Sequence, residues 1–381
     1  MTQNPDFDQI RPFRDEEVSA AIDKLVNEPY FVRMIPALFP SIPVEAIIAK
    51  LRSVKSIEDF QVGLIIPFLD NVIKTSTYGV TASGLENIDK EKSYLFITNH
   101  RDIVLDSAFL NVKLHEAGFK TTEIGIGDNL LIYDWITGLV KLNKSFVVKR
   151  GLPVRQQMEA SGTLSAFIRD SIVNQGQNIW LAQREGRSKD GNDMTQGAVL
   201  KMLNISGKSS SMVDNIKELN VVPVSISYEF DPCDYLKAYQ YQLKRDLPDY
   251  KKSQKEDLTH MQMGITGKKG HVHFSFGKPI TPELEKITDP NKNVQVQAIV
   301  DIIDNQIYSN YHLWPGNYLA YDILEKSDRF RDKYTDDDKK AYMHYVNEHN
   351  SRLEDADHAF IYDTILKMYA NPVYNMLKVT E

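Results

Sequence analysis

The chain has 381 residues, of which 42% are hydrophobic and 25% are charged, and its formal net charge is −7 at pH 7. This length can bury a large core in one or two domains, and the composition is ordinary for a globular protein. The negative charge argues against nucleic acid as the main partner and against a purely electrostatic membrane tether, because both would favour a basic surface.

The single cysteine, Cys233, excludes an internal disulfide and fits a reducing compartment. The first ten residues lack the regions of a secretory signal and a myristoylation pattern. The longest apolar run, 62–73, contains Pro67 and Asp70 and is shorter than the roughly 18 to 20 residues that span a bilayer. We therefore expect a cytoplasmic protein, peripheral on the inner face of the membrane. Run 62–73 predicts either a lipid-contacting helix or a core helix.

Residues 1–76 have the pattern of a helical segment interrupted by prolines. Apolar residues recur there at the spacing of one helix face, at Ile47, Ile48, Leu51 and Val54. Residues 291–381 also have a helical pattern. We therefore expect helical segments at both ends of the chain, flanking a central domain at 77–290.

The central domain alternates short apolar runs with longer amphipathic ones. The short runs predict strands, at 78–85, 94–98, 121–127, 145–149, 178–182, 221–228 and 271–276. The longer runs predict helices at 103–117, through 135–141, and from Val154 toward Gly176. Short apolar strands separated by helices predict an α/β fold, with a mostly parallel central sheet flanked by helices.

The strand at 94–98 stops at Asn99-His100, and Asp102 and Asp106 follow within the next six residues. Ligands of open α/β sheets bind at the carboxyl ends of strands. A histidine oriented by a carboxylate is a general base that can take the proton of an attacking alcohol. Such a pair taken alone is more often a structural hydrogen bond, so the other strand ends decide between the two interpretations.

Three further strand ends carry polar or charged groups. The sequences there are "FVVKRG" with Lys149 and Arg150, "AQREGRS" with Glu185, Gly186, Arg187 and Ser188, and "VPVSISYE" with Pro223 and Glu229. Residues 141–155 include five basic residues and no acidic one. Arginines bind phosphate oxygens through two parallel hydrogen bonds. These strand ends therefore predict an anion site beside the histidine. The G-x-S-x-G pattern of a nucleophilic serine is missing from the sequence, so the base would activate a bound hydroxyl.

These four segments resemble the four ordered blocks of the phospholipid/glycerol acyltransferase family, and most of all its glycerol-3-phosphate and dihydroxyacetone-phosphate branch. The matching residues are His100 in the first block, Arg150 at the end of the second, Glu185-Gly186-Arg187-Ser188 in the third and Pro223 in the fourth. The resemblance covers about residues 78–280 and implies the fold of glycerol-3-phosphate acyltransferases.

The resemblance implies an O-acyltransferase of phospholipid biosynthesis. It would move a fatty acyl chain from acyl-CoA or acyl-carrier protein to a hydroxyl of glycerol-3-phosphate or a related phosphorylated glycerol. His100 would deprotonate that hydroxyl, and Asp106, or Asp102 in second place, would orient the imidazole. The residues implied in binding the substrate phosphate or shaping its loop are Lys149, Arg150, Glu185, Gly186, Arg187 and Ser188. Pro223 would be an acyl-contacting or structural residue. No metal or redox cofactor is implied, and a membrane surface is an expected partner.

Two features depart from the family pattern and keep alternatives open. The family separates the histidine from its aspartate by four residues, where this chain has Leu105, and the third block lacks one glycine of the "EGGRS" form. One alternative is an acyltransferase for lysophosphatidic acid or an amino-acid lipid. The other is a non-catalytic protein that binds lipid or acyl-carrier protein, in which the displaced aspartate marks lost chemistry.

Overall fold

A computed structural model describes residues 7–39 and 42–381. Seven strands form one sheet in the order β1-β7-β6-β2-β5-β3-β4. The strands are β1 (Gly79–Ser83), β2 (Leu95–Thr98), β3 (Thr122–Gly127), β4 (Ser145–Val148), β5 (Asn178–Ala182), β6 (Val221–Tyr228) and β7 (His271–Phe276). Each lies within two residues of a predicted strand, so the predicted α/β fold with a mostly parallel sheet is confirmed.

The direction of the strands decides where their ends meet. All neighbouring pairs are parallel except β6 and β7, which are antiparallel. Strands β2 to β6 therefore run in one direction, and β1 and β7 run against them. The carboxyl ends of β2, β4, β5 and β6 consequently reach the same edge of the sheet.

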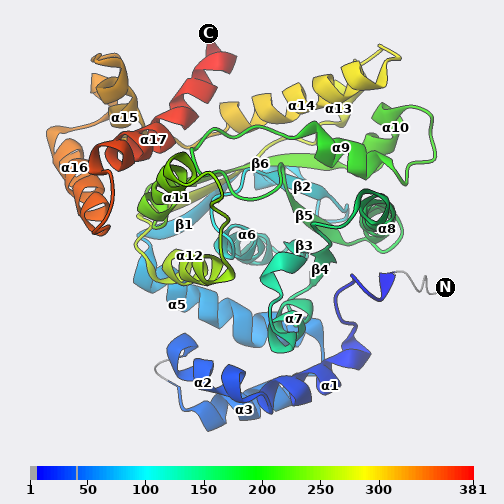
Figure 1. Cartoon of the computed structure of the whole chain (residues 1–381). Coiled ribbons are helices and arrows are strands. Elements are labelled where there is room, and N and C mark those ends of the chain that lie inside the picture. Colours follow the sequence, from blue (N-terminus) through cyan, green and yellow to red (C-terminus); the bar gives the residue numbers. More distant parts are fainter. Residues whose placement is uncertain (1–6, 40–41) are drawn as a thin grey trace.

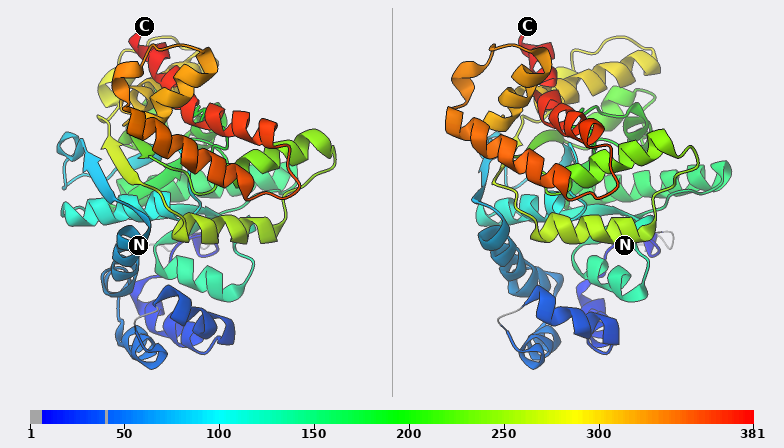
Figure 2. Two further views of the ribbon diagram at one scale, coloured as in Figure 1. Left: turned by 90° about the vertical axis from the view of Figure 1, so that its left-hand side faces the viewer. Right: turned by 60° about the vertical axis from the view of Figure 1, so that its left-hand side comes forward.

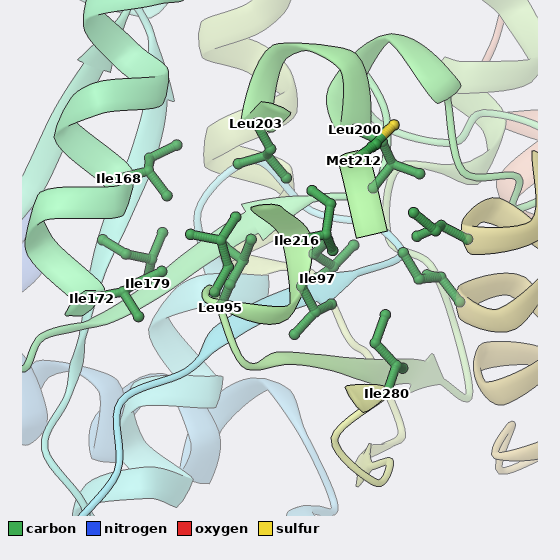
Figure 3. Packing of buried hydrophobic residues seen from close by; sticks show 14 of the residues in the cluster. Leu95, Ile97, Ile168, Ile172, Ile179, Leu200, Leu203, Met212, Ile216 and Ile280 are labelled. Atoms are coloured by element: carbon green, nitrogen blue, oxygen red, sulfur yellow. The ribbon is translucent and has the colours of Figure 1, made fainter. Parts of the chain in front are cut away.

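Strand β2 shows why the sheet is covered on both faces. All four of its residues are buried, and successive side chains point to opposite faces. Leu95 and Ile97 join one apolar cluster, whereas Phe96 joins another. Figure 3 shows the first cluster, in which Ile168 and Ile172 pack near Leu95 and Ile179.

The two faces of the sheet carry different helices. The first cluster is covered by α8 (Val154–Val173), α9 (Gly197–Asn204), α10 (Met212–Lys217), α13 (Thr281–Leu284) and α14 (Lys292–Ser309). The second is covered by α5 (Ile66–Ser76) and α6 (Leu105–Glu116). The predicted helices at 103–117 and from Val154 correspond to α6 and α8.

The N-terminal helices form a layer at one end of the molecule (Figure 1). They are α1 (Asp15–Val26), α2 (Pro29–Leu38), α3 (Val44–Ser53), α4 (Ile57–Phe60) and the π-helical turn η2 (Gln61–Ile65), which continues into α5. The helix α7 (Asp134–Leu142) packs against them through Trp135, Leu139 and Leu142. Apolar run 62–73 falls in η2 and α5, and Leu64, Leu69 and Val72 are buried, as in the core-helix alternative.

The C-terminal helices gather at the opposite end of the molecule (Figure 2). They are α15 (Pro315–Glu325), α16 (Asp336–Ser351) and α17 (His358–Thr380), and they share an apolar cluster with α11 (Asp234–Asp246). The helix α12 (Gln254–Thr266) lies beside α11 in front of the sheet (Figure 1). Among the helices of the described residues, none is both long and apolar enough to cross a bilayer.

Candidate active site

The histidine of the first block lies at the sheet edge where the strand ends meet. His100 follows β2 by two residues, and its carbonyl oxygen accepts a hydrogen bond of 2.8 Å from the backbone N–H of Ser188. Its ring meets the Trp180 ring of the neighbouring β5 edge-on, with centroids 5.5 Å apart. The third-block loop and β5 therefore fix the position of His100.

Asp106 is the carboxylate that contacts this histidine. Its Oδ2 lies 2.8 Å from Nδ1 of His100, and the same oxygen accepts the backbone N–H groups of Arg101 at 2.6 Å and Asp102 at 3.0 Å. Its Oδ1 accepts the hydroxyl of Tyr228 at 3.0 Å. A carboxylate held by these donors fixes the imidazole with the proton on Nδ1, which leaves Nε2 free to accept one.

Asp102 has a different place and makes no hydrogen bond with the imidazole. Its Oδ1 accepts the backbone N–H groups of Val104 and Leu105, each at 2.8 Å, at the start of α6. Burial and the nearby Asp106 carboxylate raise its pKa. Because α6 begins at Leu105, Asp106 lies in the first turn, where side chains point back toward the preceding loop. This geometry restores the pairing that the longer spacing put in question.

A large cavity opens beside His100, with a volume of about 1830 Å³. One part of its wall is apolar and comes from the N-terminal helices and α7: Phe31, Met34, Leu51, Phe60, Phe68 and Ile136. Another part is basic and comes from the loops after β4 and β5, from α11 and from the loop between α11 and α12. The cavity therefore offers both a surface for an alkyl chain and a surface for anions next to the histidine.

Arg150 reaches the cavity from the end of β4. Its Nη1 lies 3.7 Å from Oε1 of Glu185, and its backbone N–H donates to Asp128 at 3.2 Å. A Cβ on Gly127 would lie only 2.8 Å from Nε of Arg150, so the glycine makes room for the guanidinium. Lys149 also lines the cavity, but its ammonium donates to the side chain of Gln9 at 2.8 Å.

Arg187 reaches the cavity from the third-block loop. Its Nη2 donates to Nδ1 of His260 at 3.3 Å. Burial, and then the positive charges of Arg187 and Lys252, lower the pKa of His260 to about 2, so its ring is neutral and can accept this bond. Nη1 of Arg187 and Nε of Arg184 are buried without a hydrogen-bond partner among the described residues, which suits them to an incoming anion.

The predicted site residues divide into three groups. His100, Lys149, Arg150, Glu185, Gly186 and Arg187 line the cavity. Asp102 lies in the turn between His100 and α6, and Asp106 lies in the first turn of α6. Ser188 and Pro223 do not line the cavity. The Ser188 hydroxyl donates to Asp190 at 3.3 Å, and Pro223 lies within β6 opposite Ile97. We therefore see Ser188 as a loop-shaping residue and Pro223 as a residue of the sheet.

Sequence reasoning missed Tyr228 and Trp180. Tyr228 ends β6, which neighbours β2, so its hydroxyl reaches Asp106. Burial and the Asp106 charge raise the pKa of Tyr228 well above 10, which keeps the hydroxyl protonated and donating. Both residues lie on strands that flank β2. Their role depends on the strand order, which the sequence does not show. Tyr228 lies within the segment "VPVSISYE", but nothing there indicated a contact with Asp106.

Comparisons of this chain with known proteins gave a family match and a structural match. The sequence model of the family described as Acyltransferase matches residues 79–227, from β1 to the end of β6. A solved structure, the 1-acyl-sn-glycerophosphate (LPA) acyltransferase PlsC from Thermotoga maritima, is 15% identical, with a TM-score of 0.37, and the alignment covers 75% of this chain and 94% of that one. A search of curated proteins found no match.

Proposed function

We propose that this protein is an O-acyltransferase that moves a fatty acyl chain from a thioester to a hydroxyl of glycerol-3-phosphate or a related phosphorylated glycerol. The observation that carries the proposal is the His100–Asp106 pair beside a cavity with both a basic and an apolar wall. The Acyltransferase family model, which spans both residues, supports the reaction class.

The dyad supports a direct transfer. Nε2 of His100 takes the proton of the acceptor hydroxyl while the hydroxyl oxygen attacks the thioester carbonyl. The imidazolium that forms is stabilised by the Asp106 carboxylate at 2.8 Å. Collapse of the tetrahedral intermediate breaks the carbon–sulfur bond, and His100 returns its proton to the leaving thiolate. The products are an ester and a free thiol.

The walls of the cavity support the choice of substrates. Arg150 and Arg187 present guanidinium groups to the cavity, and guanidinium groups match the geometry of phosphate oxygens. The apolar wall accepts the acyl chain of the thioester. An amine-bearing lipid without a phosphate would offer these arginines no anionic ligand, which favours a phosphorylated acceptor over an amino-acid lipid.

The size of the cavity supports lysophosphatidic acid as a second candidate acceptor. Its volume of about 1830 Å³ exceeds the roughly 300 to 1,000 Å³ of ordinary small-molecule sites, so a donor chain and an acceptor chain fit together. The non-catalytic alternative loses its main support, because Asp106 contacts His100 despite the longer spacing.

An acceptor panel tests the proposal. The purified protein is incubated with acyl-CoA or acyl-carrier protein and with glycerol-3-phosphate, dihydroxyacetone phosphate, lysophosphatidic acid or an amino-acid lipid. Free thiol and ester product are measured together. We expect thiol and ester in equal amounts, with a phosphorylated glycerol as the best acceptor. Thiol release that is independent of every acceptor, or no turnover with any pair, would contradict the proposal.

A further inference from the structure

The basic wall of the cavity holds more positive charge than the acceptor accounts for. Arg184, Arg187, Lys189 and Lys244 all line it, and no carboxylate in the described parts of the chain lies within 4.0 Å of their charged nitrogens. By contrast, Lys252 on the same wall is ion-paired with Asp257. Unpaired cations that crowd one wall of a chain with net charge −7 indicate an anion site.

The helix α11 brings Lys244 to this wall. Lys237, Gln240, Tyr241 and Lys244 follow at the spacing of one helix face. Lys237 is buried and donates to the carbonyl oxygen of Arg101 at 2.8 Å, which fixes the helix against the turn that carries His100. Gln240, Tyr241 and Lys244 continue this face into the cavity. The placement of Lys244 therefore follows from the same contacts that hold the candidate active site.

Lys189 faces Lys244 from the loop after β5. Burial, and then the charges of Lys244, Lys252 and Arg187, lower the pKa of Lys189 to about 8. Lys189 is partly buried inside the cavity, whereas Lys244 is exposed at its mouth. The ammonium groups of Lys189 and Lys244 therefore lie at different depths, one within the cavity wall and one near solvent.

The number of these cations points to a second ligand. A phosphomonoester carries roughly −1.5 to −2 charges at pH 7, and Arg150 and Arg187 suffice for it. We propose that Lys189 and Lys244, together with Arg184, form a separate subsite for the phosphate groups of the thioester carrier. The ligand class is the nucleotide part of coenzyme A, with its diphosphate and 3′-phosphate. This inference rests on the proposed acyl transfer.

A small nucleotide fits the subsite better than the acidic surface of a carrier protein. The diphosphate and the 3′-phosphate of coenzyme A, which are attached at different positions of its ribose, can contact both Lys244 and the partly buried Lys189. A folded carrier protein would place its carboxylates at the mouth, beside Lys244, and would bring into the cavity only the single phosphodiester of its phosphopantetheine arm. The subsite therefore assigns acyl-CoA as the preferred donor.

Charge reversal at the exposed lysine tests the subsite. Lys244→Glu is compared with Lys278→Glu, a matched change at an exposed lysine outside the cavity. The donors are acyl-CoA, acyl-pantetheine, which has the same thioester without phosphates, and acyl-carrier protein. We expect Lys244→Glu to raise the KM for acyl-CoA about five- to tenfold, with unchanged KM for acyl-pantetheine and for the acceptor. Calorimetry should show that Lys244→Glu also binds coenzyme A alone more weakly than wild type does.

The outcomes separate the subsite from the function. Unchanged coenzyme A binding in Lys244→Glu, while wild-type transfer proceeds, would overturn the subsite and leave the acyltransferase intact. A higher KM for the acceptor would assign these cations to the acceptor phosphate instead. A selective loss with acyl-carrier protein would assign them to a protein donor. Absence of ester from all three donors would contradict the proposed function. Calorimetry of coenzyme A binding would then still show whether the subsite exists.

Discussion

At the scale of single residues, Asp106 performs more than one task. Its two oxygens accept two backbone N–H groups, the Tyr228 hydroxyl and the bond that joins it to His100. An oxygen that accepts several hydrogen bonds has little freedom to rotate away from the imidazole. Asp102, which is closer to His100 in the sequence, accepts backbone N–H groups of Val104 and Leu105 instead.

This difference predicts opposite outcomes for two matched substitutions. Asp106→Asn should lower kcat by about 10²- to 10⁴-fold, because the amide neither fixes the productive tautomer nor stabilises the imidazolium. Asp102→Asn should keep most of the activity and cost about 1 kcal/mol of stability or less, since Asn also caps helices. Steady-state rates at matched folded fractions measure both. Full loss in the Asp102 variant with a normal rate in the Asp106 variant would reverse the assignment.

The sequence indicated His100 and a pair of candidate aspartates, but the choice between them required the structure. Sequence patterns place the start of a helix only to within a few residues. A helix that began one residue earlier would turn Asp106 away from the loop and bring Leu105 nearer to it. The start at Leu105 thus decides the partner of the histidine.

At the scale of elements, a buried network ties the turn after β2 to the rest of the sheet. Oδ2 of Asp193 accepts Nη2 of Arg101 at 2.6 Å, Nδ2 of Asn99 at 3.1 Å and the Tyr311 hydroxyl at 2.7 Å. The Asn99 side chain also exchanges two hydrogen bonds with the backbone of Ile226 in β6. This network holds the residues on either side of His100.

Removing the charge at its centre should lower both stability and kcat. Asp193→Asn leaves the buried guanidinium of Arg101 without its carboxylate partner, which costs about 3 to 5 kcal/mol for a buried pair. Among the molecules that stay folded, kcat should fall while the thioester KM changes little, because Asp193 does not line the cavity. Urea unfolding and kinetics measure the two effects. Asp337→Asn, at an exposed ion pair, is the control. Wild-type kcat in the folded Asp193 variant would contradict a positioning role.

The pairing of α12 with the third-block loop predicts sensitivity to acid. His260 has its pKa lowered to about 2 from an ordinary value of 6.5. Between these values the unfolded chain binds a proton that the folded protein does not. The free energy of unfolding should therefore fall as pH falls below about 6.5. Denaturant unfolding from pH 7.5 to 5 should show a smaller fall for His260→Gln. Parallel pH profiles for the two proteins would contradict this account.

The individual strands were predictable, but their neighbours were not. Short, nearly continuous apolar runs mark β2, β5 and β6 in the sequence, since each run is bounded by polar residues. The order that places β6 beside β2 depends on long-range packing, and it brings Tyr228 to Asp106. The polar helix α11 likewise gave no sign that Lys237 would contact the turn at Arg101.

At the scale of the whole molecule, the candidate site is formed by the central domain together with the N-terminal helical segment, which the sequence analysis separated. The predicted boundary at 76 falls at the end of α5. The helices before it supply Phe31, Leu51, Phe60 and Phe68 to the cavity wall. Periodicity predicts that a helix has an apolar face, but it does not show against which element that face packs. The sequence therefore predicted candidate site residues but not the helices that enclose them.

The mouth of the cavity predicts how the protein meets lipid. Tyr30, Met34, Tyr133 and Leu258 line the cavity and are 65%, 41%, 54% and 42% exposed. We expect peripheral binding through these apolar side chains, so flotation with liposomes should survive high salt, which screens exposed charges. The double variant Tyr30→Glu/Met34→Glu should float less. Val294→Glu, at an exposed valine outside the cavity, should float normally. Release of the wild-type protein by salt alone would show an electrostatic tether instead.

His100 is proposed as the general base of acyl transfer, and removal of its imidazole tests this role. The measurement is the rate of ester formation from a thioester and a phosphorylated glycerol by wild type and His100→Ala, at matched folded fraction and with thioester binding followed separately. We predict that His100→Ala binds the thioester normally and loses about 10²- to 10⁴-fold in rate. A rate close to that of wild type would contradict the account.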